Sequence, residues 1–274
     1  MKKKNLLLLL VIGFLLLSSR PLDADIGPKP SVTIQVKNPP EGVYYMTLLS
    51  KEESFGPWHK IEQSEIDMGD KDDAFIAFAN YQDKDGFCFL GNHTNMEGKE
   101  EYYWSYYPPD EFKVAVYLEN GTIIVSDIVK KEAFDSYFTI DFLQEGLGIR
   151  EDARLGRQLL YFLLRVILTI LIEYGIAWLM GYRSRKERRV IIIANIITQV
   201  ILNAILMFFD YYAGALVWLL MFPIGELAVF IIELVIYLIA MKGHKKWKTF
   251  LYTLIANIIT AALTLFTTII QWSN

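Results

Sequence analysis

Four long apolar stretches in the second half of the chain constrain its fold more than any other feature. They cover about residues 158–182, 190–209, 214–241 and 249–271. About 20 helical residues cross the ~30 Å hydrocarbon core of a bilayer, and each stretch is at least about that long. Residues 151–274 are therefore predicted to form an all-α transmembrane bundle of four helices. A single soluble domain is excluded.

The positions of basic residues predict how these four spans are oriented. Five Lys and Arg lie within Arg183–Arg189 and four lie within Lys242–Lys248, whereas Asp210–Ala213 contains none. Basic loops remain in the cytoplasm, so the first span enters from outside and Asn274 ends outside. The prediction is a multi-pass plasma-membrane protein with neither terminus of the mature chain in the cytoplasm. The two basic loops either only set this topology or also bind anionic lipid head groups of the bilayer.

The start of the chain has the pattern of a secretory signal. Three lysines at positions 2–4 precede the 12-residue apolar run Leu6–Leu17. A basic segment followed by an apolar run of this length is typical of a signal peptide. Residues 1–24 are predicted to be this signal, either cleaved after Ser19 or Ala24 or retained as an anchor.

Residues 25–150 are predicted to be an acidic, β-rich domain outside the cell. From Asp25 to Arg154 the chain has 12 Lys and Arg against 25 Asp and Glu, a net charge of −13. Such a domain repels phosphate, which excludes nucleic acid as a partner. Cys88 is the only cysteine, so no intramolecular disulfide supports the fold.

Short strand-like runs favour a β-sandwich-like or α+β fold for this domain. Period-two alternation and β-forming residues predict strands at 31–36, 43–49, 112–118, 122–126 and 135–142. Residues 73–80 are interpreted as a short helix. The pair Asn120-Gly121 lies between two of these strands and predicts a hairpin with a type I′ turn.

Two motifs in the domain each have two interpretations. The aromatic residues Tyr102, Tyr103, Trp104, Tyr106 and Tyr107 either form a surface patch for sugars or a protein, or alternate across a strand with one face in the core. The segment Asp83–Gly86 starts like a calcium loop. The loop needs a bidentate Glu at its twelfth position, where this chain has Thr94, so an Asp/Gly turn is predicted.

A short repeat occurs within the apolar stretches. The hexapeptide at 193–198 is identical to that at 255–260, and Ile172-Glu173-x-x-Ile176 matches Ile232-Glu233-x-x-Ile236. In each copy the glutamate helix comes first, a basic segment follows, and the Asn-x-x-Thr helix comes last. The bundle is therefore predicted to be a duplicated helix hairpin, with both copies starting outside.

Polar residues inside the spans form a candidate intramembrane site: Glu173, Glu233, Glu226, Asn195, Thr198, Asn257 and Thr260. Glu173 lies about 13 Å from the first basic segment along its helix, and Glu233 lies at a similar depth. Ionised carboxylates are costly at such depths, so they are expected to be protonated, hydrogen-bonded or in contact with water. They either bind a proton, cation or polar ligand, or hold the helices together by hydrogen bonds, or take part in catalysis.

Motifs for several chemistries are missing. The sequence has no His-Glu-x-x-His zinc motif, no P-loop, no Gly-x-Ser-x-Gly elbow and no ligand pattern for haem or iron–sulfur clusters. No catalytic, cofactor-binding or metal-binding residue is predicted, and the sequence disfavours an enzyme.

Four segments resemble membrane proteins of low-GC Gram-positive bacteria whose function is uncharacterised. They are residues 25–30, 38–41, 106–113 and 133–138. The resemblance implies a signal peptide, an extracytoplasmic domain and a C-terminal four-helix membrane region. It implies no activity.

The leading functional hypothesis is an extracytoplasmic binding, accessory or sensor subunit held by the bundle. Its expected partner is another membrane protein or an envelope component, and no oligomeric state is predicted. The first alternative is a small carrier or channel that uses Glu173 and Glu233. The second is a membrane enzyme acting on lipid or cell-wall precursors.

Overall fold

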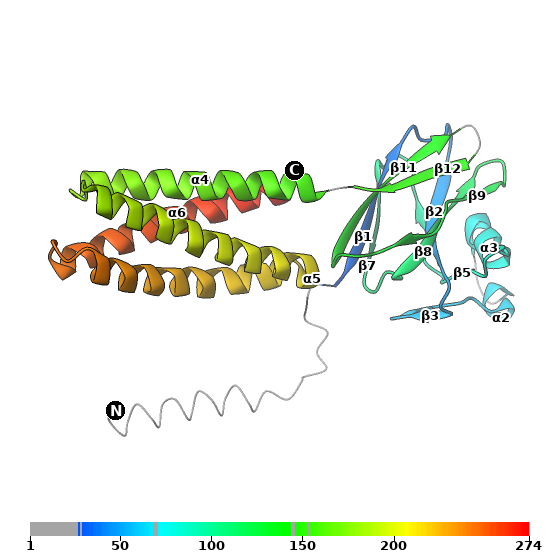
Figure 1. Cartoon of the computed structure of the whole chain (residues 1–274). Coiled ribbons are helices and arrows are strands. Elements are labelled where there is room, and N and C mark those ends of the chain that lie inside the picture. The colour runs from blue at the N-terminus through cyan, green and yellow to red at the C-terminus, as the bar shows by residue number, and fades with distance from the viewer. Residues whose placement is uncertain (1–26, 28, 68–70, 144–145, 153, 274) are drawn as a thin grey trace, which may run out of the picture.

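A computed structural model describes residues 27, 29–67, 71–143, 146–152 and 154–273. The predicted signal at residues 1–24 lies outside the described residues. The chain has a β-rich N-terminal region and a C-terminal region of long helices. The two regions are arranged end to end (Figure 1).

The first sheet has the strand order β12-β11-β1-β7. Its strands are β1 (Ser31–Lys37), β7 (Glu101–Ser105), β11 (Asp135–Leu143) and β12 (Gly146–Glu151). The central pair, β1 and β11, is parallel, and the two outer pairs are antiparallel. Strands that are about 100 residues apart in sequence therefore form the middle of this sheet.

The second sheet has the strand order β10-β8-β2-β5, with β6 on β2 and β9 on β8. These strands are β2 (Tyr44–Ser50), β5 (Cys88–Phe89), β6 (Thr94–Asn95), β8 (Glu111–Leu118), β9 (Ile123–Val125) and β10 (Val129–Lys130). The remaining elements of the region are the hairpin of β3 (Ser54–Phe55) and β4 (Trp58–His59) and the helices α2 (Gln63–Asp67) and α3 (Asp73–Asn80).

The two sheets share one hydrophobic core, so the region contains a β-sandwich. Ile34 and Trp104 of the first sheet contact the same cluster as Met46 and Val114 of the second. The outer face of the second sheet is covered by α3, whose Phe78 belongs to a second buried cluster. Alternate residues of β2 and β8 thus enter different cores, as strand geometry requires.

The predicted hairpin forms, but its turn is of another type. β8 and β9 pair antiparallel, and the amide of Gly121 donates to the carbonyl of Leu118. Gly121 has φ 83°, whereas Asn120 is not among the described residues with positive φ. A type I′ turn needs positive φ at both positions, so the type I′ prediction is wrong. The three-residue loop has the pattern of a type I turn followed by a left-handed glycine.

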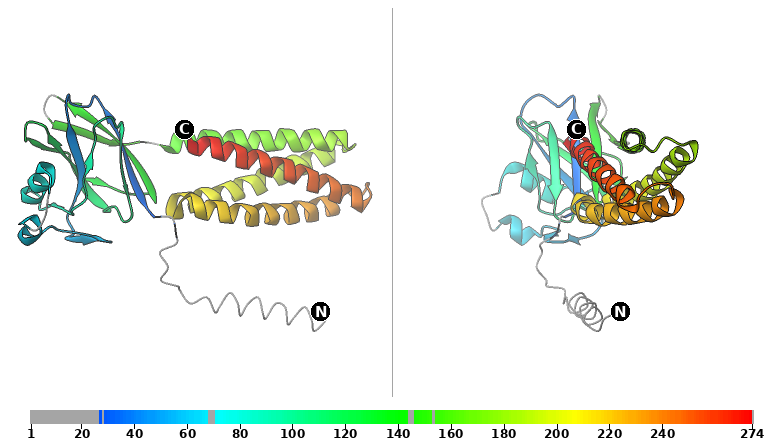
Figure 2. Two further views of the ribbon diagram at one scale, coloured as in Figure 1. Left: turned by 180° about the vertical axis from the view of Figure 1, so that it is seen from behind. Right: turned by 90° about the vertical axis from the view of Figure 1, so that its left-hand side faces the viewer.

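The C-terminal region consists of the helices α4 (Arg154–Leu179), α5 (Arg185–Ala240) and α6 (Lys246–Ser273). All three are long and apolar enough to cross a membrane. The 56-residue α5 is interrupted at Gly214, where φ is 78° and ψ is 176°. The two arms on either side of Gly214 run in opposite directions (Figures 1 and 2). A loop was expected at Asp210–Ala213, but these residues are helical and the chain reverses at Gly214.

The β-rich region contacts this reversal. The amide of Phe134 donates to the carbonyl of Tyr211 at 2.8 Å. A β-carbon at Gly214 would lie 2.6 Å from the ring of Phe134, so the ring occupies the space that glycine leaves open. The two regions are therefore joined by packing as well as by the short segment between β12 and α4.

Candidate functional site in the helical region

The helices bury polar residues and expose apolar ones. On α4, Arg165, Thr169 and Glu173 follow one another at four-residue spacing, and all three are buried. The buried polar residues of α6 are Thr249, Thr253, Asn257, Thr260, Thr264 and Thr268. Leucine and isoleucine side chains on the outer faces are exposed. This distribution is the reverse of that in a soluble bundle and is typical of a membrane protein with a polar interior.

Glu173 lies in a network that joins α4, both arms of α5 and α6. Nδ2 of Asn195 donates to Oε2 of Glu173 at 2.7 Å and lies 3.0 Å from the hydroxyl of Tyr237. The hydroxyl of Tyr252 donates a longer bond, 3.4 Å, to the same carboxyl oxygen. The side chains of Glu173 and Asn195 are fully buried.

Glu233, on the second arm of α5, is held in a similar way. The hydroxyl of Thr198 donates to Oε1 of Glu233 at 2.6 Å, and Nδ2 of Asn257 donates to Oε2 at 3.0 Å. Glu233 is fully buried as well. Each of the two glutamates therefore accepts a hydrogen bond from an asparagine of the following helical segment.

Two of the predicted site residues make no hydrogen bond to the side chains of the two glutamates or their asparagines. The hydroxyl of Thr260 donates to the backbone carbonyls of Ala256 and Asn257 in its own helix. Glu226 is buried, and neither of its carboxyl oxygens has a hydrogen-bond partner among the described residues. Hydrogen bonds between side chains thus join five of the seven residues in two groups. One group is Glu173 with Asn195, and the other is Glu233 with Thr198 and Asn257.

Several buried oxygens of the two networks have no partner within the described part of the chain. They are Oε1 of Glu173, Oδ1 of Asn195 and Oδ1 of Asn257. An unpaired buried polar atom costs about 1–3 kcal/mol, so such atoms need water, a proton or an ion. Carboxyl and amide oxygens are suitable acceptors for each of these.

Sequence reasoning missed several polar residues of this interior, among them Arg165, Thr169, Tyr237 and Tyr252. Arg165 donates from Nη1 to Oγ1 of Thr268 at 3.0 Å, at one end of the bundle. Thr169 is also buried in the helical region, and so are Tyr237 and Tyr252 nearer its opposite end. The spacing of Arg165, Thr169 and Glu173 is a sequence signal that would have identified the first two. The tyrosines carry no comparable signal, because aromatic residues are common on every face of a span.

At the other end of the bundle the polar interior reaches a partly buried pair of His244 and Glu187. Nε2 of His244 lies 2.7 Å from Oε1 of Glu187, and the ring of His244 packs on Tyr182. The hydroxyl of Tyr182 donates to Oγ1 of Thr249. Polar side chains therefore extend from Arg165 to Glu187 and His244.

The aromatic residues of the β-rich region alternate across a strand. Tyr102 and Trp104 are fully buried in the core of the sandwich, whereas Tyr103 between them is 59% exposed. Tyr106 and Tyr107 follow the strand and both have positive φ. A surface patch of all five residues is therefore wrong, and the alternating-strand interpretation is confirmed.

Asp83–Gly86 forms a turn, as predicted, and holds a buried ion pair that the sequence did not reveal. The carboxylate of Asp83 accepts hydrogen bonds from the amides of Asp85 and Phe87 and from Nζ of Lys113 at 2.8 Å. Burial alone raises the pKa of Asp83, but the bonds from Lys113 and the two amides outweigh it and the net pKa is lowered. Burial likewise lowers the pKa of Lys113, but its bonds to Asp83 and Asp85 outweigh it and the net pKa is raised.

No family model, curated protein or solved structure significantly matches the chain. Among the described residues, no group of three or more His, Cys, Asp or Glu is arranged to hold a metal ion.

Proposed function

We propose that the chain crosses the plasma membrane four times, with one crossing for each of α4, α6 and the two arms of α5. At 1.5 Å per residue, Trp247 and Trp272 at the ends of α6 are separated by about 37 Å, which matches a bilayer core with part of its interfaces. Exposed tryptophans also occur at Trp178 near the basic end, and Tyr212 is exposed at the opposite end. Aromatic residues at both ends of apolar helices are typical of the two membrane interfaces.

The four crossings are proposed to be a duplicated helix hairpin in which the basic segments lie in the cytoplasm. The Glu173–Asn195 bond joins α4 to the first arm of α5, and the Glu233–Asn257 bond joins the second arm to α6. The same two residue types thus make the same contact within each copy of the sequence repeat. This agreement between repeat and contact supports the duplication.

The function that the geometry supports best is a small carrier or channel in which Glu173 and Glu233 bind a proton or a monovalent cation. The observation that carries this proposal is the polar interior, which extends from Arg165 to Glu187 and His244 through two buried glutamates. Helix association does not explain so many buried polar residues. Packing of the helices supplies much of the association, and one hydrogen bond between spans contributes only about 0.6 kcal/mol on average. Carboxyl groups inside a membrane commonly mark proton or ion pathways.

Flux through reconstituted protein tests this function. Full-length protein in vesicles containing a pH-sensitive dye is subjected to a pH step, and then to a sodium or potassium gradient. We expect Glu173→Gln and Glu233→Gln to reduce flux at least about tenfold, since each removes an ionisable group. Glu97→Gln in the exported region is the matched control and should leave flux unchanged. Wild-type flux equal to that of empty vesicles would refute the carrier.

A second candidate function is an extracytoplasmic binding, accessory or sensor subunit for an envelope component or another membrane protein. The contact of Phe134 with Tyr211 and Gly214 favours it, because this contact joins the exported region to the reversal of α5. A photo-crosslinking amino acid at Tyr103 in living cells should then form a specific adduct. The lipid-facing Leu171 is the control position, and equal adducts at both positions would refute this candidate.

A further inference from the structure

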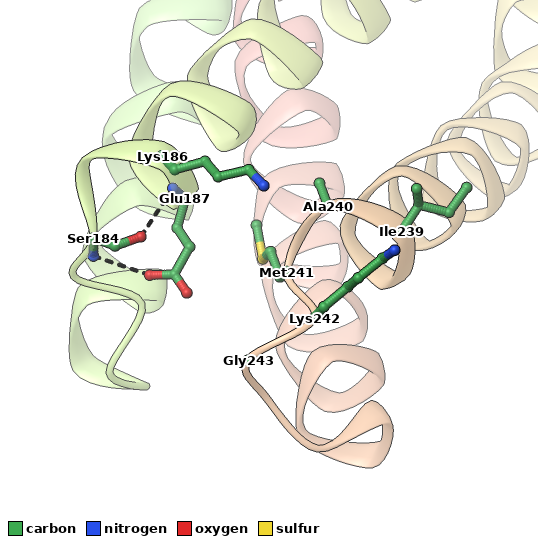
Figure 3. A pocket seen from close by; sticks show the side chains of 8 residues that line it. All are labelled: Ser184, Lys186, Glu187, Ile239, Ala240, Met241, Lys242 and Gly243. Carbon is green, nitrogen blue, oxygen red and sulfur yellow. Dashed lines mark hydrogen bonds between the residues drawn. The ribbon is translucent and has the colours of Figure 1, made fainter.

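A pocket lies at the basic end of the helical region, where the beginning and the end of α5 come together. It is lined by Ser184, Lys186, Glu187, Ile239, Ala240, Met241, Lys242 and Gly243, and its volume is about 490 Å³ (Figure 3). Two segments that are more than 50 residues apart in sequence thus form its two walls. The polar core around Glu173 and Glu233 contributes no residue to this lining.

The charge of the lining is positive. Lys186 and Lys242 contribute two ammonium groups, and neither has a hydrogen-bond or ion-pair partner within the described ranges of the chain. Glu187 is the only carboxylate in the lining, and both of its oxygens are already bound. Oε1 pairs with His244 at 2.7 Å and Oε2 accepts from the amide of Ser184 at 2.9 Å. The unsatisfied charges of the pocket are therefore both cationic.

The remaining wall is apolar and continues onto the outer surface of the helices. Ile239 is 66% exposed there, and Ala240 and Met241 lie next to it. The side chain of Lys186 extends across the pocket towards Ala240 and Met241 (Figure 3). Exposed tryptophans at Trp178 and Trp247 mark this end as the level of the membrane interface. Cationic and apolar groups thus meet at the depth where lipid phosphates lie.

We propose that this pocket binds the phosphate of an anionic phospholipid, with the lipid glycerol and the start of its chains on Ile239 and the adjacent apolar wall. Lysine ammonium groups bind phosphate as point charges. Basic pockets between membrane helices on the cytoplasmic side are suited to anionic head groups. The proposal does not rest on the carrier function, because the two lysines and the apolar wall that it uses belong to neither glutamate network; Glu187 alone is common to the pocket and the polar interior.

Lipid binding by the full-length protein tests the proposal. The protein in detergent is titrated with phosphatidylglycerol or phosphatidylcholine, and bound lipid is counted by native mass spectrometry. The double substitution of Lys186→Gln with Lys242→Gln should weaken phosphatidylglycerol binding about tenfold or more and leave phosphatidylcholine binding unchanged. The matched control is Lys245→Gln with Lys246→Gln, which removes the same charge from the same end but outside the pocket. It should change binding less than about twofold.

A second variant keeps the charge and removes the space. Ala240→Trp fills the pocket and should weaken phosphatidylglycerol binding, whereas Lys186→Arg with Lys242→Arg should retain it. Equal losses in the pocket and control double variants would reduce the effect to diffuse surface charge and overturn the proposal. Unchanged binding in Ala240→Trp would also overturn it. Binding of inorganic phosphate without any preference for phosphatidylglycerol would overturn the lipid assignment.

Discussion

Nδ2 of Asn195 lies 2.7 Å from Oε2 of Glu173, and both side chains are fully buried between α4 and α5. The bond supplies a donor to a carboxyl group that has no access to water. The second glutamate, Glu233, receives the corresponding bond from Asn257 at 3.0 Å. Because these asparagines satisfy acidic groups, they should matter more for stability than polar residues that bond only to their own helix.

We predict that Asn195→Leu and Asn257→Leu each destabilise the protein by about 1–3 kcal/mol, since each leaves a buried carboxyl oxygen without its donor. Thermal unfolding in detergent measures the effect. Thr260→Val is the control, because its hydroxyl bonds within its own helix, and it should cost less. Equal stability of Asn195→Leu and Thr260→Val would contradict the importance of the buried bond.

Glu173→Gln and Glu233→Gln should behave differently and remain within about 1 kcal/mol of the wild type. The amide oxygen still accepts from asparagine, and the hydroxyl of Thr198 is free to donate to the carbonyl of Ala194 instead. The same unfolding experiment measures this. A large loss of stability in both variants would show that the carboxyl groups themselves are needed for folding. Reduced flux in these variants would then not distinguish loss of the ionisable group from loss of the fold.

Gly214→Ala is predicted to destabilise the protein by about 1–3 kcal/mol. The position requires positive φ, which alanine adopts at a cost, and the new methyl group would meet the ring of Phe134. Gly175→Ala, a helical glycine with no neighbour within 4 Å of the added carbon, is the control and should be neutral or stabilising. Combining Gly214→Ala with Phe134→Ala should relieve the clash but not the backbone strain. An unchanged midpoint for Gly214→Ala alone would contradict the tight reversal.

The buried pair of Asp83 and Lys113 predicts a pH dependence. The folded-state pKa of Asp83 lies below its ordinary value of 3.8, so its stabilisation is fully present above that value and is lost as the pH falls through the lower folded-state pKa. At neutral pH, Asp83→Asn should cost about 1.5–3 kcal/mol, and this difference should shrink in acid.

Hydrogen exchange of β8 amides in the full-length protein would report this local loss of stability. Glu53→Gln at the exposed pair with Lys60 is the control and should have almost no effect. A difference between Asp83→Asn and the wild type that stays constant down to strongly acidic pH would contradict the assignment to this carboxylate.

Cysteine labelling in a Cys88→Ser background checks the proposed topology. Arg185→Cys lies at a basic end and should react with an impermeant thiol reagent only after the cells are opened. Tyr212→Cys, at an exposed position near the reversal of α5, should react in intact cells. Labelling of the first position, or protection of the second, would reverse the proposed orientation.

Most of the β-rich region could be predicted from sequence because its strands obey local rules. Alternation and β-forming residues identified β1, β2, β8, β9 and β11, and Asn120-Gly121 identified the hairpin, whereas β12 was not predicted. A short helix was predicted at the position of α3. The pairing of β1 with β11 could not be predicted, because the partners are more than 100 residues apart and alternation does not specify a partner. The type of the hairpin turn depends on φ at Asn120, which one dipeptide does not determine.

The candidate site was predicted in composition but not in its contacts. Hydropathy made Glu173 and Glu233 conspicuous, and the repeat linked each to an asparagine. Neither signal determines how helices rotate about their axes, so the bond of Thr198 to Glu233 and the isolation of Glu226 were not foreseen. The burial of Lys113 was not foreseen for a different reason: a lysine in a strand normally faces water.

The parallel pairing of β1 with β11 has a consequence for biogenesis. β1 cannot acquire its central neighbour until residue 143 has been synthesised, and α4 begins only 11 residues later, at Arg154. If residues 25–150 are exported, the sandwich must close while the first membrane helix is already within the secretion machinery. Until then, the edge of β1 that later pairs with β11 is open to other chains. We therefore expect newly made protein to depend on folding factors outside the cytoplasm during this interval. Pulse-labelled chains should be protease-sensitive until α4 is released into the lipid.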